Sequence, residues 1–428
     1  MFTKKETILF AALLHAPFAA AATLCVNPGG TSGCYITIGA AVSAAKAGDQ
    51  INVGIGQYTE DVVITKPLSL VGAGAESTII NAKGLANGIY VDGVDNGGLT
   101  NVLISGFTVV NANFEGILVT NTSYTVIAQN HVVNNDQSVN FSAGTCPGQP
   151  IFETSEGDDC GEGIHLIGVD HAVVSNNESE LNSGGVLLSD ETGYTHDNLI
   201  VGNSVHDNIL DCGITLASHP PSPQAASKLP YGVFNNTIQG NRVSGNGIAG
   251  EGAGIGLYAP GPGNQTFGNK IIGNIITNNG LPGVAMHNHA APAGAPGVNM
   301  NDTIITGNYI SGNGADVQDS ATAGTAGINI YSVAPVYGMV IAENTIVNEQ
   351  IGVVMNNPGV MELHMNNLPG SGVGVQGVTG IVHASMNYFG CAGGPGTTGC
   401  STAKGSAVSA APSLSAPVAT APSAKQNP

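Results

Sequence analysis

The chain has 428 residues, a formal net charge of −19, only 9% charged residues, 62 glycines and no tryptophan. Nucleic-acid binding depends on cationic side chains that neutralise phosphates, so this charge argues against nucleic acid as a partner and also against an anionic membrane surface. Frequent glycine, asparagine, valine and isoleucine favour short strands joined by tight turns over helices.

The N-terminal segment has the pattern of an export signal. Lys4 and Lys5 precede an apolar run that starts at Ile8, and three alanines occupy positions 20–22. This pattern predicts a signal peptide over residues 1–22. No later segment has the length of apolar sequence that a transmembrane helix requires, so we expect a secreted or periplasmic protein.

Seven cysteines agree with an oxidising compartment. Six form close pairs around loops that contain glycine or proline, and we expect each pair to be a disulfide: Cys25–Cys34, Cys146–Cys160 and Cys391–Cys400. The seventh, Cys212, directly precedes an apolar strand and is expected to be a buried thiol with a packing role.

One helix is predicted, over residues 38–47, because a run of alanine and valine ends with Lys46 and is followed by Gly48. Short strands are predicted next, over residues 50–53, 61–64 and 68–71. A helix placed before a stack of strands would cover the open end of the stack, which would otherwise expose an unpaired edge.

From residue 87 onward two short phrases alternate. One is a glycine followed by an apolar strand, at Gly88, Gly116, Gly163, Gly185, Gly213, Gly254, Gly283, Gly327 and Gly352. The other contains an asparagine, at Asn130, Asn176, Asn203, Asn241, Asn274, Asn308 and Asn344. A repeat of roughly 22 residues or more predicts a solenoid, and about three short strands per repeat predict an all-β parallel β-helix. The asparagines are expected to adopt left-handed turn conformations and to bond to their equivalents one coil away.

The opening motifs Thr37-Ile-Gly-Ala-Ala-Val and Leu68-Ser-Leu-Val-Gly-Ala-Gly resemble the cap and first coils of right-handed parallel β-helix proteins of the pectin-lyase-like superfamily. The segment 387–400 is similar to a closing motif of secreted bacterial members. The resemblance implies one β-helix domain over residues 23–400 with an N-terminal cap at about 37–48. The superfamily includes lyases, hydrolases, epimerases and adhesins, so it implies the fold without the activity. Residues 401–428, rich in alanine, serine and proline, are expected to be a flexible tail.

Alignment of the glycine-apolar strands predicts one functional wall. Strand side chains alternate between the two faces, and adjacent coils lie about 4.8 Å apart, so outward residues of consecutive coils become neighbours. The candidate catalytic residues on this wall are Asp190, Glu191, His219, Tyr258, His287 and His289. Candidate substrate-binding residues are His165, Asp197, Asp211, Tyr331 and Asn356. The longest connections, 189–198, 217–235, 258–268 and 286–302, follow the same strands and are expected to wall a groove.

Carboxylates and imidazoles on one wall allow three kinds of chemistry. A carboxylate pair could cleave a glycosidic bond as acid and base. A histidine or tyrosine could remove the C5 proton of a uronic acid whose carboxylate is neutralised by donors or by a cation, and calcium is the candidate cofactor. Imidazoles of His219, His287 and His289 with Glu191 could instead bind a transition metal. For any one histidine, the alternative is a polar residue on a solvated face.

We therefore expect a monomeric exported protein that binds and modifies an extended polysaccharide, as a lyase, an epimerase or a glycosidase, in that order. One alternative is a non-catalytic surface or envelope protein that uses the β-helix as a spacer or carbohydrate-binding platform. A second is a periplasmic metal-handling protein, similar to the β-helix protein that helps to mature the copper site of nitrous oxide reductase.

Overall fold

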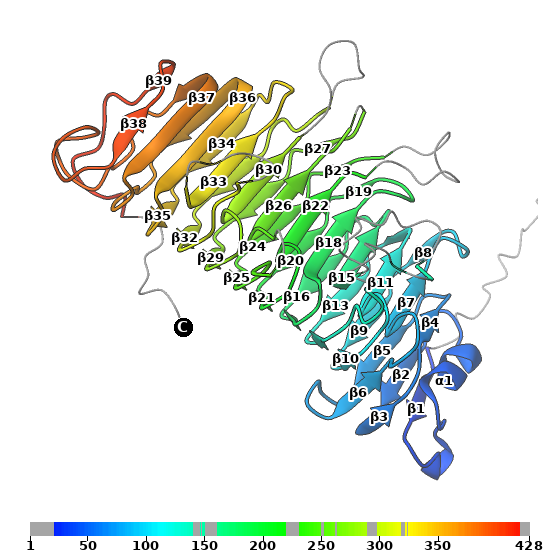
Figure 1. Ribbon diagram of the computed structural model, residues 1–428. Coiled ribbons are helices and arrows are strands. Elements are labelled where there is room, and N and C mark those ends of the chain that lie inside the picture. The colour runs from blue at the N-terminus through cyan, green and yellow to red at the C-terminus, as the bar shows by residue number, and fades with distance from the viewer. Residues whose placement is uncertain are drawn as a thin grey trace, which may run out of the picture.

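The computed structural model describes residues 21–139, 146, 148–149, 161–219, 231–249, 252–261, 263–288, 298–317, 322 and 324–419. In these residues the chain winds into an elongated stack of parallel strands, with α1 (Ile38–Ala44) at the N-terminal end and the last strands at the other (Figure 1). The predicted right-handed parallel β-helix is confirmed.

Each coil contributes strands to three faces. Face 1, which carries the predicted wall, consists of β4 (Val62–Ile64), β7 (Ile89–Asp92), β11 (Ile117–Thr120), β15 (Glu162–Ile167), β18 (Gly184–Ser189), β22 (Ile214–Ala217), β26 (Ile255–Tyr258), β30 (Val284–His287), β33 (Ala326–Tyr331), β36 (Ile351–His364), β37 (Val373–His383) and β38 (Thr402–Lys404). All pairings on this face are parallel.

Face 2 consists of β1 (Thr23–Val26), β2 (Gln50–Val53), β5 (Ser69–Gly72), β9 (Leu103–Ser105), β13 (Val126–Ala128), β16 (Val173–Ser175), β20 (Leu199–Val201), β24 (Thr237–Gln239), β28 (Lys270–Ile272), β31 (Ile304–Thr306), β34 (Met339–Ala342), the later parts of β36 and β37, and β39 (Val408–Ser409). Short strands between faces 1 and 2 are β8 (Leu99–Thr100), β12 (Thr122–Ser123), β19 (Thr195–His196), β23 (Val233–Phe234) and β27 (Thr266–Phe267).

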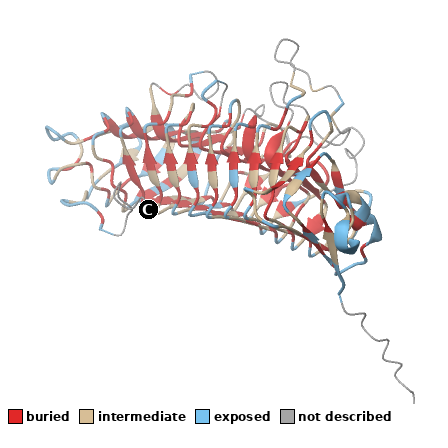
Figure 2. Cartoon of the chain, turned by 90° about the horizontal axis from the view of Figure 1, so that it is seen from below, coloured by how far each residue is buried: buried red, intermediate tan, exposed pale blue. Residues whose placement is uncertain are grey.

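Face 3 is a separate sheet of β3 (Gly56–Tyr58), β6 (Thr78–Asn81), β10 (Thr108–Val110), β14 (His131–Val133), β17 (Glu178–Glu180), β21 (Ser204–His206), β25 (Arg242–Ser244), β29 (Ile275–Thr277), β32 (Tyr309–Ser311) and β35 (Thr345–Val347). The three faces enclose one long core of valine, isoleucine and leucine side chains. Figure 2 colours much of the strand ribbon along the stack as buried. Each coil buries little apolar surface alone and becomes stable by stacking on its neighbours.

The repeated glycines mark places where one coil presses on the next. A Cβ atom at Gly213 would lie 2.4 Å from the Cγ1 atom of Val243 and 2.9 Å from the carbonyl oxygen of Gly254. No side chain fits there without moving the backbone, and this explains why a glycine opens the strands of face 1 from β7 to β37.

The asparagine phrases form hydrogen-bonded ladders, as predicted. In the ladder that contains Asn203 and Asn241, each side-chain oxygen accepts bonds from the backbone N–H and the side-chain amide of the preceding coil. The expected left-handed conformation belongs to the residue before each ladder position, with φ of 53° at Asn176 and 66° at Gly202. In the coil of β16 and β17 the ladder residue is Asn177, one position beyond the predicted Asn176.

The N-terminal cap is shorter than predicted. α1 ends at Ala44, three residues before the expected end, and its N-cap is Thr37, whose hydroxyl accepts a bond from the backbone N–H of Ala40 at 3.2 Å. The ammonium of Lys66 donates to the carbonyl oxygens of Val42 and Ala45 at 3.0 and 3.1 Å, which satisfies the last turn. The predicted signal peptide lies outside the described residues except for its last two positions.

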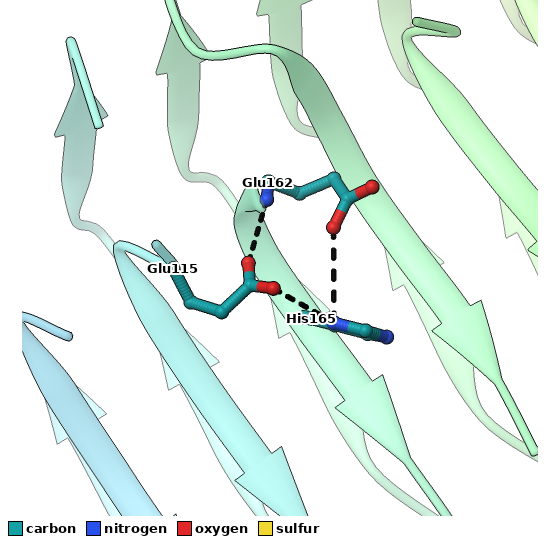
Figure 3. A group of neighbouring side chains, drawn as sticks. All are labelled: Glu115, Glu162 and His165. Carbon is teal, nitrogen blue, oxygen red and sulfur yellow. Dashed lines mark hydrogen bonds and ion pairs between the residues drawn. The ribbon is translucent and has the colours of Figure 1, made fainter. Parts of the chain in front are cut away.

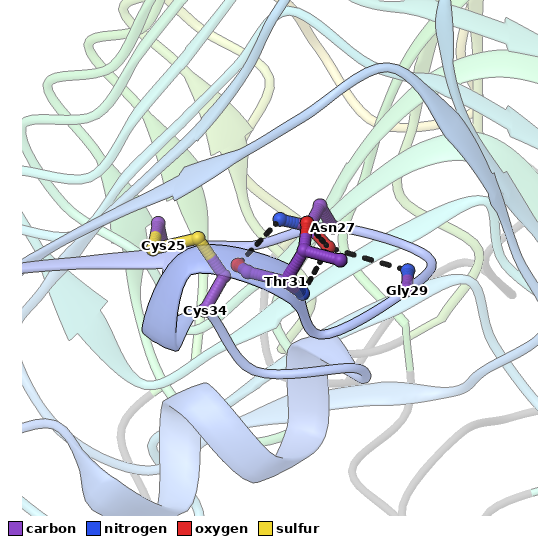
Figure 4. Close-up of a disulfide and its surroundings, with 5 residues drawn as sticks. All are labelled: Cys25, Asn27, Gly29, Thr31 and Cys34. Carbon is purple, nitrogen blue, oxygen red and sulfur yellow. Dashed lines mark hydrogen bonds between the residues drawn. A yellow bond between two sulfur atoms is a disulfide. The ribbon is translucent and has the colours of Figure 1, made fainter.

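Two of the three expected disulfides are present in the described residues. Cys25–Cys34 closes a loop in the first coil (Figure 4), and Cys391–Cys400 closes one near the C-terminal end. Cys160 lies outside the described residues, so its pairing with Cys146 stays a prediction. Cys212 is a free, buried thiol, and burial raises its pKa well above the usual value, which fits a packing role. The described part of the chain has no helix that is long and apolar enough to span a membrane.

The expectation of a flexible tail from residue 401 needs correction. β38 pairs with β37 on face 1, and β39 pairs with β37 on face 2. Further on, the backbone N–H of Val418 donates to the side-chain oxygen of Asn367 at 2.7 Å, and Val418 is buried. The segment is ordered because the last full coil offers unpaired backbone groups and an apolar edge that it covers. Residues 420–428 lie outside the described residues.

Candidate functional site

The predicted wall forms at the C-terminal ends of the strands of face 1. Ser189 of β18 aligns with Ala217 of β22, which aligns with Tyr258 of β26, which in turn aligns with His287 of β30. Glu191 and His219 follow the first two of these positions by two residues each. The register therefore places these side chains on consecutive coils in the predicted order.

Glu191 and His219 lie in contact in a buried position, on two adjacent coils. The Oε1 atom of Glu191 lies 3.0 Å from the Nδ1 atom of His219, and the two side chains are only 2% and 6% exposed. The other carboxylate oxygen, Oε2, accepts a hydrogen bond from the hydroxyl of Ser189. This carboxylate lies against the Nδ1 side of the imidazole ring, where its negative charge stabilises a protonated ring.

Asp190 holds the backbone of the neighbouring coil. Its Oδ2 atom accepts a hydrogen bond from the hydroxyl of Ser218 at 2.7 Å, and its Oδ1 atom accepts one from the backbone N–H of His219 at 2.8 Å. The hydroxyl of Ser218 also accepts a bond from the side-chain amide of Asn264, at 3.1 Å. Asp190 thus holds the backbone of His219, and Glu191 contacts the ring of the same residue.

The pKa values of the two adjacent carboxyl groups are shifted in opposite directions. Burial raises the pKa of Asp190 to about 7, against the opposing effect of the Ser218 hydroxyl. Burial also acts to raise the pKa of Glu191, but the His219 and His165 rings and the Ser189 hydroxyl outweigh it and lower that pKa to about 2. Neighbouring carboxyls whose pKa values are pushed apart mark sites of acid–base chemistry in enzymes.

The raised pKa of Asp190 has a consequence for stability that depends on pH. Its folded-state pKa of about 7 lies above the ordinary aspartate pKa of 3.8. The stability that the protonated carboxyl contributes is therefore complete below the lower value and is lost as pH rises through the higher one. We expect the free energy of unfolding of the wild type to fall between pH ~5 and ~8 by up to about 1.4 kcal/mol per pH unit more than that of Asp190→Asn. Urea titrations of both proteins at the two pH values measure this, and equal pH dependence would contradict it.

Tyr258 and His287 continue the wall with less burial. The ring centroids of Tyr258 and His219 lie 6.4 Å apart in an edge-on arrangement. The Nε2 atom of His287 lies 3.5 Å from the Oδ2 atom of Asp316, and the His287 side chain is 14% exposed. The wall thus presents a phenol and a second imidazole beyond the Glu191–His219 pair.

The remaining predicted residues divide into two groups. His165 joins the site, since its Nε2 atom lies 2.7 Å from the Ser189 hydroxyl, and Tyr331 aligns with Asn356 further along face 1. Asp197 lies apart, in the turn after β19, where it pairs with His196, and Asp211 precedes β22, at the opposite end of that strand from His219. His289 lies outside the described residues, as do parts of the long connections, so the groove stays a prediction.

Sequence reasoning missed two acidic residues near the wall, Glu115 and Glu162. Each directly precedes one of the repeated glycines, in the phrases Glu115-Gly-Ile and Glu162-Gly-Ile. An alignment of the residue before the glycine in successive coils would have placed them side by side.

Two groups of side chains in the described residues lie close enough to share a metal ion: Glu115, Glu162 and His165, and on face 3, Glu180, His206 and Asp207. Neither group contains His219 or His287. The alternative metal site of His219, His287 and His289 with Glu191 is therefore not among the groups that the described residues form, and His289 lies outside those residues.

Two protein-family models match the sequence. The model described as "Right handed beta helix region" matches residues 71–227, and the model described as "Periplasmic copper-binding protein (NosD)" matches residues 151–333. A search of curated proteins found no match.

Solved structures with a similar fold include the catalytic domain of a GH87 α-1,3-glucanase in complex with tetrasaccharides, with a TM-score of 0.53, 12% identity and coverage of 84% of this chain and 63% of the other. The Dettilon tailspike protein gives a TM-score of 0.51 and 14% identity, with coverage of 87% and 62%. An alginate lyase from Paenibacillus sp. str. FPU-7 gives 0.49 and 14%, with coverage of 78% and 95%. The chain spans about three fifths of the first two structures, and at these identities the likeness shows the fold alone.

Proposed function

We propose that this right-handed parallel β-helix protein, which has the pectin-lyase-like fold, binds an extended polysaccharide along the wall of face 1 and modifies it by proton transfer. The supporting observation is the buried Glu191–His219 pair beside Asp190, with the two carboxyl pKa values shifted in opposite directions.

In this proposal His219 is the base. Glu191 contacts Nδ1, so proton exchange with the sugar takes place at Nε2, and the ionised carboxylate stabilises the imidazolium that forms. The substrate proton is the one at C5 of a uronic acid, and Tyr258 on the next coil is placed to donate a proton to the departing oxygen or to the opposite face of the ring.

The contacts of the two carboxyls favour a lyase or an epimerase over a glycosidase. Both oxygens of Asp190 accept bonds from Ser218 and His219, and both oxygens of Glu191 contact Ser189 and His219. A glycosidase would need these carboxyls to face the glycosidic bond directly. The imidazole and the phenol are therefore the groups assigned to the reaction.

A panel of uronic-acid and neutral polysaccharides tests the proposal, with calcium added or chelated. Elimination gives an unsaturated uronate that absorbs in the ultraviolet, and epimerisation in heavy water places deuterium at C5, which mass spectrometry detects. We expect one of these products from at least one uronic-acid polymer. Binding with neither product on the whole panel would overturn the enzymatic proposal in favour of a carbohydrate-binding platform.

Export to the periplasm or the cell exterior belongs to the same proposal. The predicted signal peptide and the disulfides at both ends of the described chain support it, because disulfides persist in oxidising compartments. A polysaccharide substrate would be met there.

Copper binding is a second candidate function, because the NosD family model matches residues 151–333. A cluster on face 3, which we call the outer histidine cluster, suits Cu(II): His131, Glu178, Glu180, His206 and Asp207. The two imidazoles share both glutamates. His131 Nε2 lies 2.9 Å from Glu180 Oε1 and 4.0 Å from Glu178 Oε2, and His206 lies 3.2 Å from Glu178 Oε1 through Nε2 and 3.7 Å from Glu180 Oε2 through Nδ1. Copper titration of the wild type and of His131→Gln and His206→Gln tests this role, and equal affinity in all three would exclude the cluster.

A further inference from the structure

A second set of charged side chains lies on the coil before the Glu191–His219 pair, buried on β15 and beside it, between β11 and β18. The Nδ1 atom of His165 lies 3.0 Å from the Oε1 atom of Glu115 and 3.7 Å from the Oε2 atom of Glu162 (Figure 3). The three residues are between 1% and 4% exposed. We call them the inner acidic–histidine site.

The hydrogen bonds around His165 determine which of its nitrogens carries a proton. The single hydroxyl hydrogen of Ser189 is donated to Glu191, so the 2.7 Å contact between Ser189 and Nε2 of His165 requires Nε2 to be the donor. A neutral His165 therefore directs the lone pair of Nδ1 at the two glutamates. Three electron-pair donors then face one another in a buried space, an arrangement that a cation between them would stabilise.

The backbone around these side chains leaves room for the two carboxylates. A Cβ atom at Gly161 would lie 3.1 Å from the carboxyl carbon of Glu115, and one at Gly184 would lie 3.0 Å from Cγ of Glu162. The backbone N–H of Glu162 donates to the Oε2 atom of Glu115 at 2.6 Å, which holds that carboxylate with Oε1 toward His165. The donor atoms are thus held in place by the fold.

We propose that Glu115, Glu162 and His165 bind a divalent cation of the zinc type. Ligand bonds of about 2.0–2.2 Å in a tetrahedral site place the donor atoms roughly 3.3–3.5 Å apart, and the two contacts of Nδ1, at 3.0 and 3.7 Å, bracket that separation. An imidazole among the donors disfavours calcium and magnesium, which prefer oxygen ligands. Ser189 and Glu191 complete the site as the outer partners that fix the tautomer of the histidine ligand.

This ion would be separate from the copper of the outer histidine cluster and from the reacting groups of the wall. It binds on the coil of β15 and stabilises the neighbouring coil that carries Ser189 and Glu191. The inference stands whether or not the wall is catalytic, because the site is defined by its own donors. The alternative source of positive charge is a proton shared between Glu115 and His165, and metal titration separates the two.

The test uses the full chain, stripped with a chelator and titrated with Zn²⁺ against a chromophoric competitor, with Ca²⁺ in parallel. We expect one tightly bound zinc per chain at this site and no competition by calcium. Glu115→Gln and His165→Gln should each weaken zinc binding by at least about a hundred-fold. The control His383→Gln removes an exposed histidine whose Nδ1 atom lies 2.6 Å from Glu362, and it should bind zinc as the wild type does.

Two outcomes would overturn the inference: a stripped wild type that takes up no zinc, or Gln variants that bind zinc as tightly as the wild type. If the variants fail to fold, X-ray absorption of the zinc-loaded His206→Gln variant decides, because the group of Glu180, His206 and Asp207 also offers one imidazole with oxygens and this variant removes it. Bound zinc with one imidazole and oxygen neighbours in this variant supports the inner site. Loss of zinc from this variant would place the ion at the outer histidine cluster and contradict the inference.

Discussion

Replacing Glu191 by glutamine is expected to lower the rate of polysaccharide modification by about 10²- to 10⁴-fold. Glutamine keeps the size of the side chain and can still accept from Ser189, but it loses the negative charge 3.0 Å from His219. The imidazolium that forms on proton abstraction then has no counter-charge in a buried site. Steady-state kinetics on the active polymer from the panel, with the melting temperature as a check on folding, measure the effect.

The chain offers a matched control for this variant. Glu362→Gln removes a carboxylate that lies 2.6 Å from Nδ1 of His383 in an exposed ion pair on β36 and β37. It should retain wild-type rates. His219→Asn should lose about as much activity as Glu191→Gln, and the double variant should lose little more, because the two residues act as a unit. An activity of Glu191→Gln within about threefold of wild type would remove His219 from the role of base.

Replacing Asn241 by alanine is expected to reduce the free energy of unfolding by about 3–5 kcal/mol. The side-chain oxygen of Asn241 accepts two bonds from Asn203, and its amide donates to Ile200 and Asn274, all between 2.9 and 3.0 Å. Asn241 is 1% exposed, so alanine would leave buried donors and acceptors without partners on both neighbouring coils. Urea denaturation followed by circular dichroism measures the loss.

Asn52→Ala is the control for the ladder. Asn52 lies exposed on β2 and accepts one hydrogen bond from the side chain of Gln50 at 2.6 Å. Its loss should change the free energy of unfolding by about 0.5 kcal/mol or less. A similarly small effect of Asn241→Ala would mean that water or a neighbouring coil compensates for the lost ladder bonds.

The register of face 1 followed from the sequence because two simple rules determine it. A glycine opens each strand where the next coil presses on it, and side chains alternate from that point, so Ser189, Tyr258 and His287 could be assigned to one wall. The ladder asparagines repeat at similar intervals for the same reason. Regular stacking makes the position within a coil predictive of position in space.

Positions before the glycine were not predictable in this way. Whether Glu115 and Glu162 point toward the wall or away depends on how each coil turns onto face 1, and strand alternation says nothing about that turn. The partners of His165 were therefore missed, and it was interpreted as a substrate-binding residue. The composition of the segment from residue 401 also led to the wrong prediction of a flexible tail. Strands β38 and β39 form by pairing with β37, and such long-range pairing cannot be read from the local sequence.

The positions of the two described disulfides affect how readily the protein unfolds from its ends and is cleaved by proteases. A solenoid coil contacts only its neighbours, so opening starts most easily at the terminal coils, which are stacked on one side. Cys25–Cys34 and Cys391–Cys400 lie near the two ends of the described stack. The crosslinks restrict fraying where it would begin, so a protease would find fewer frayed segments to cleave. Reduction of the disulfides should therefore increase the unfolding of the terminal coils before it changes the structure of the wall.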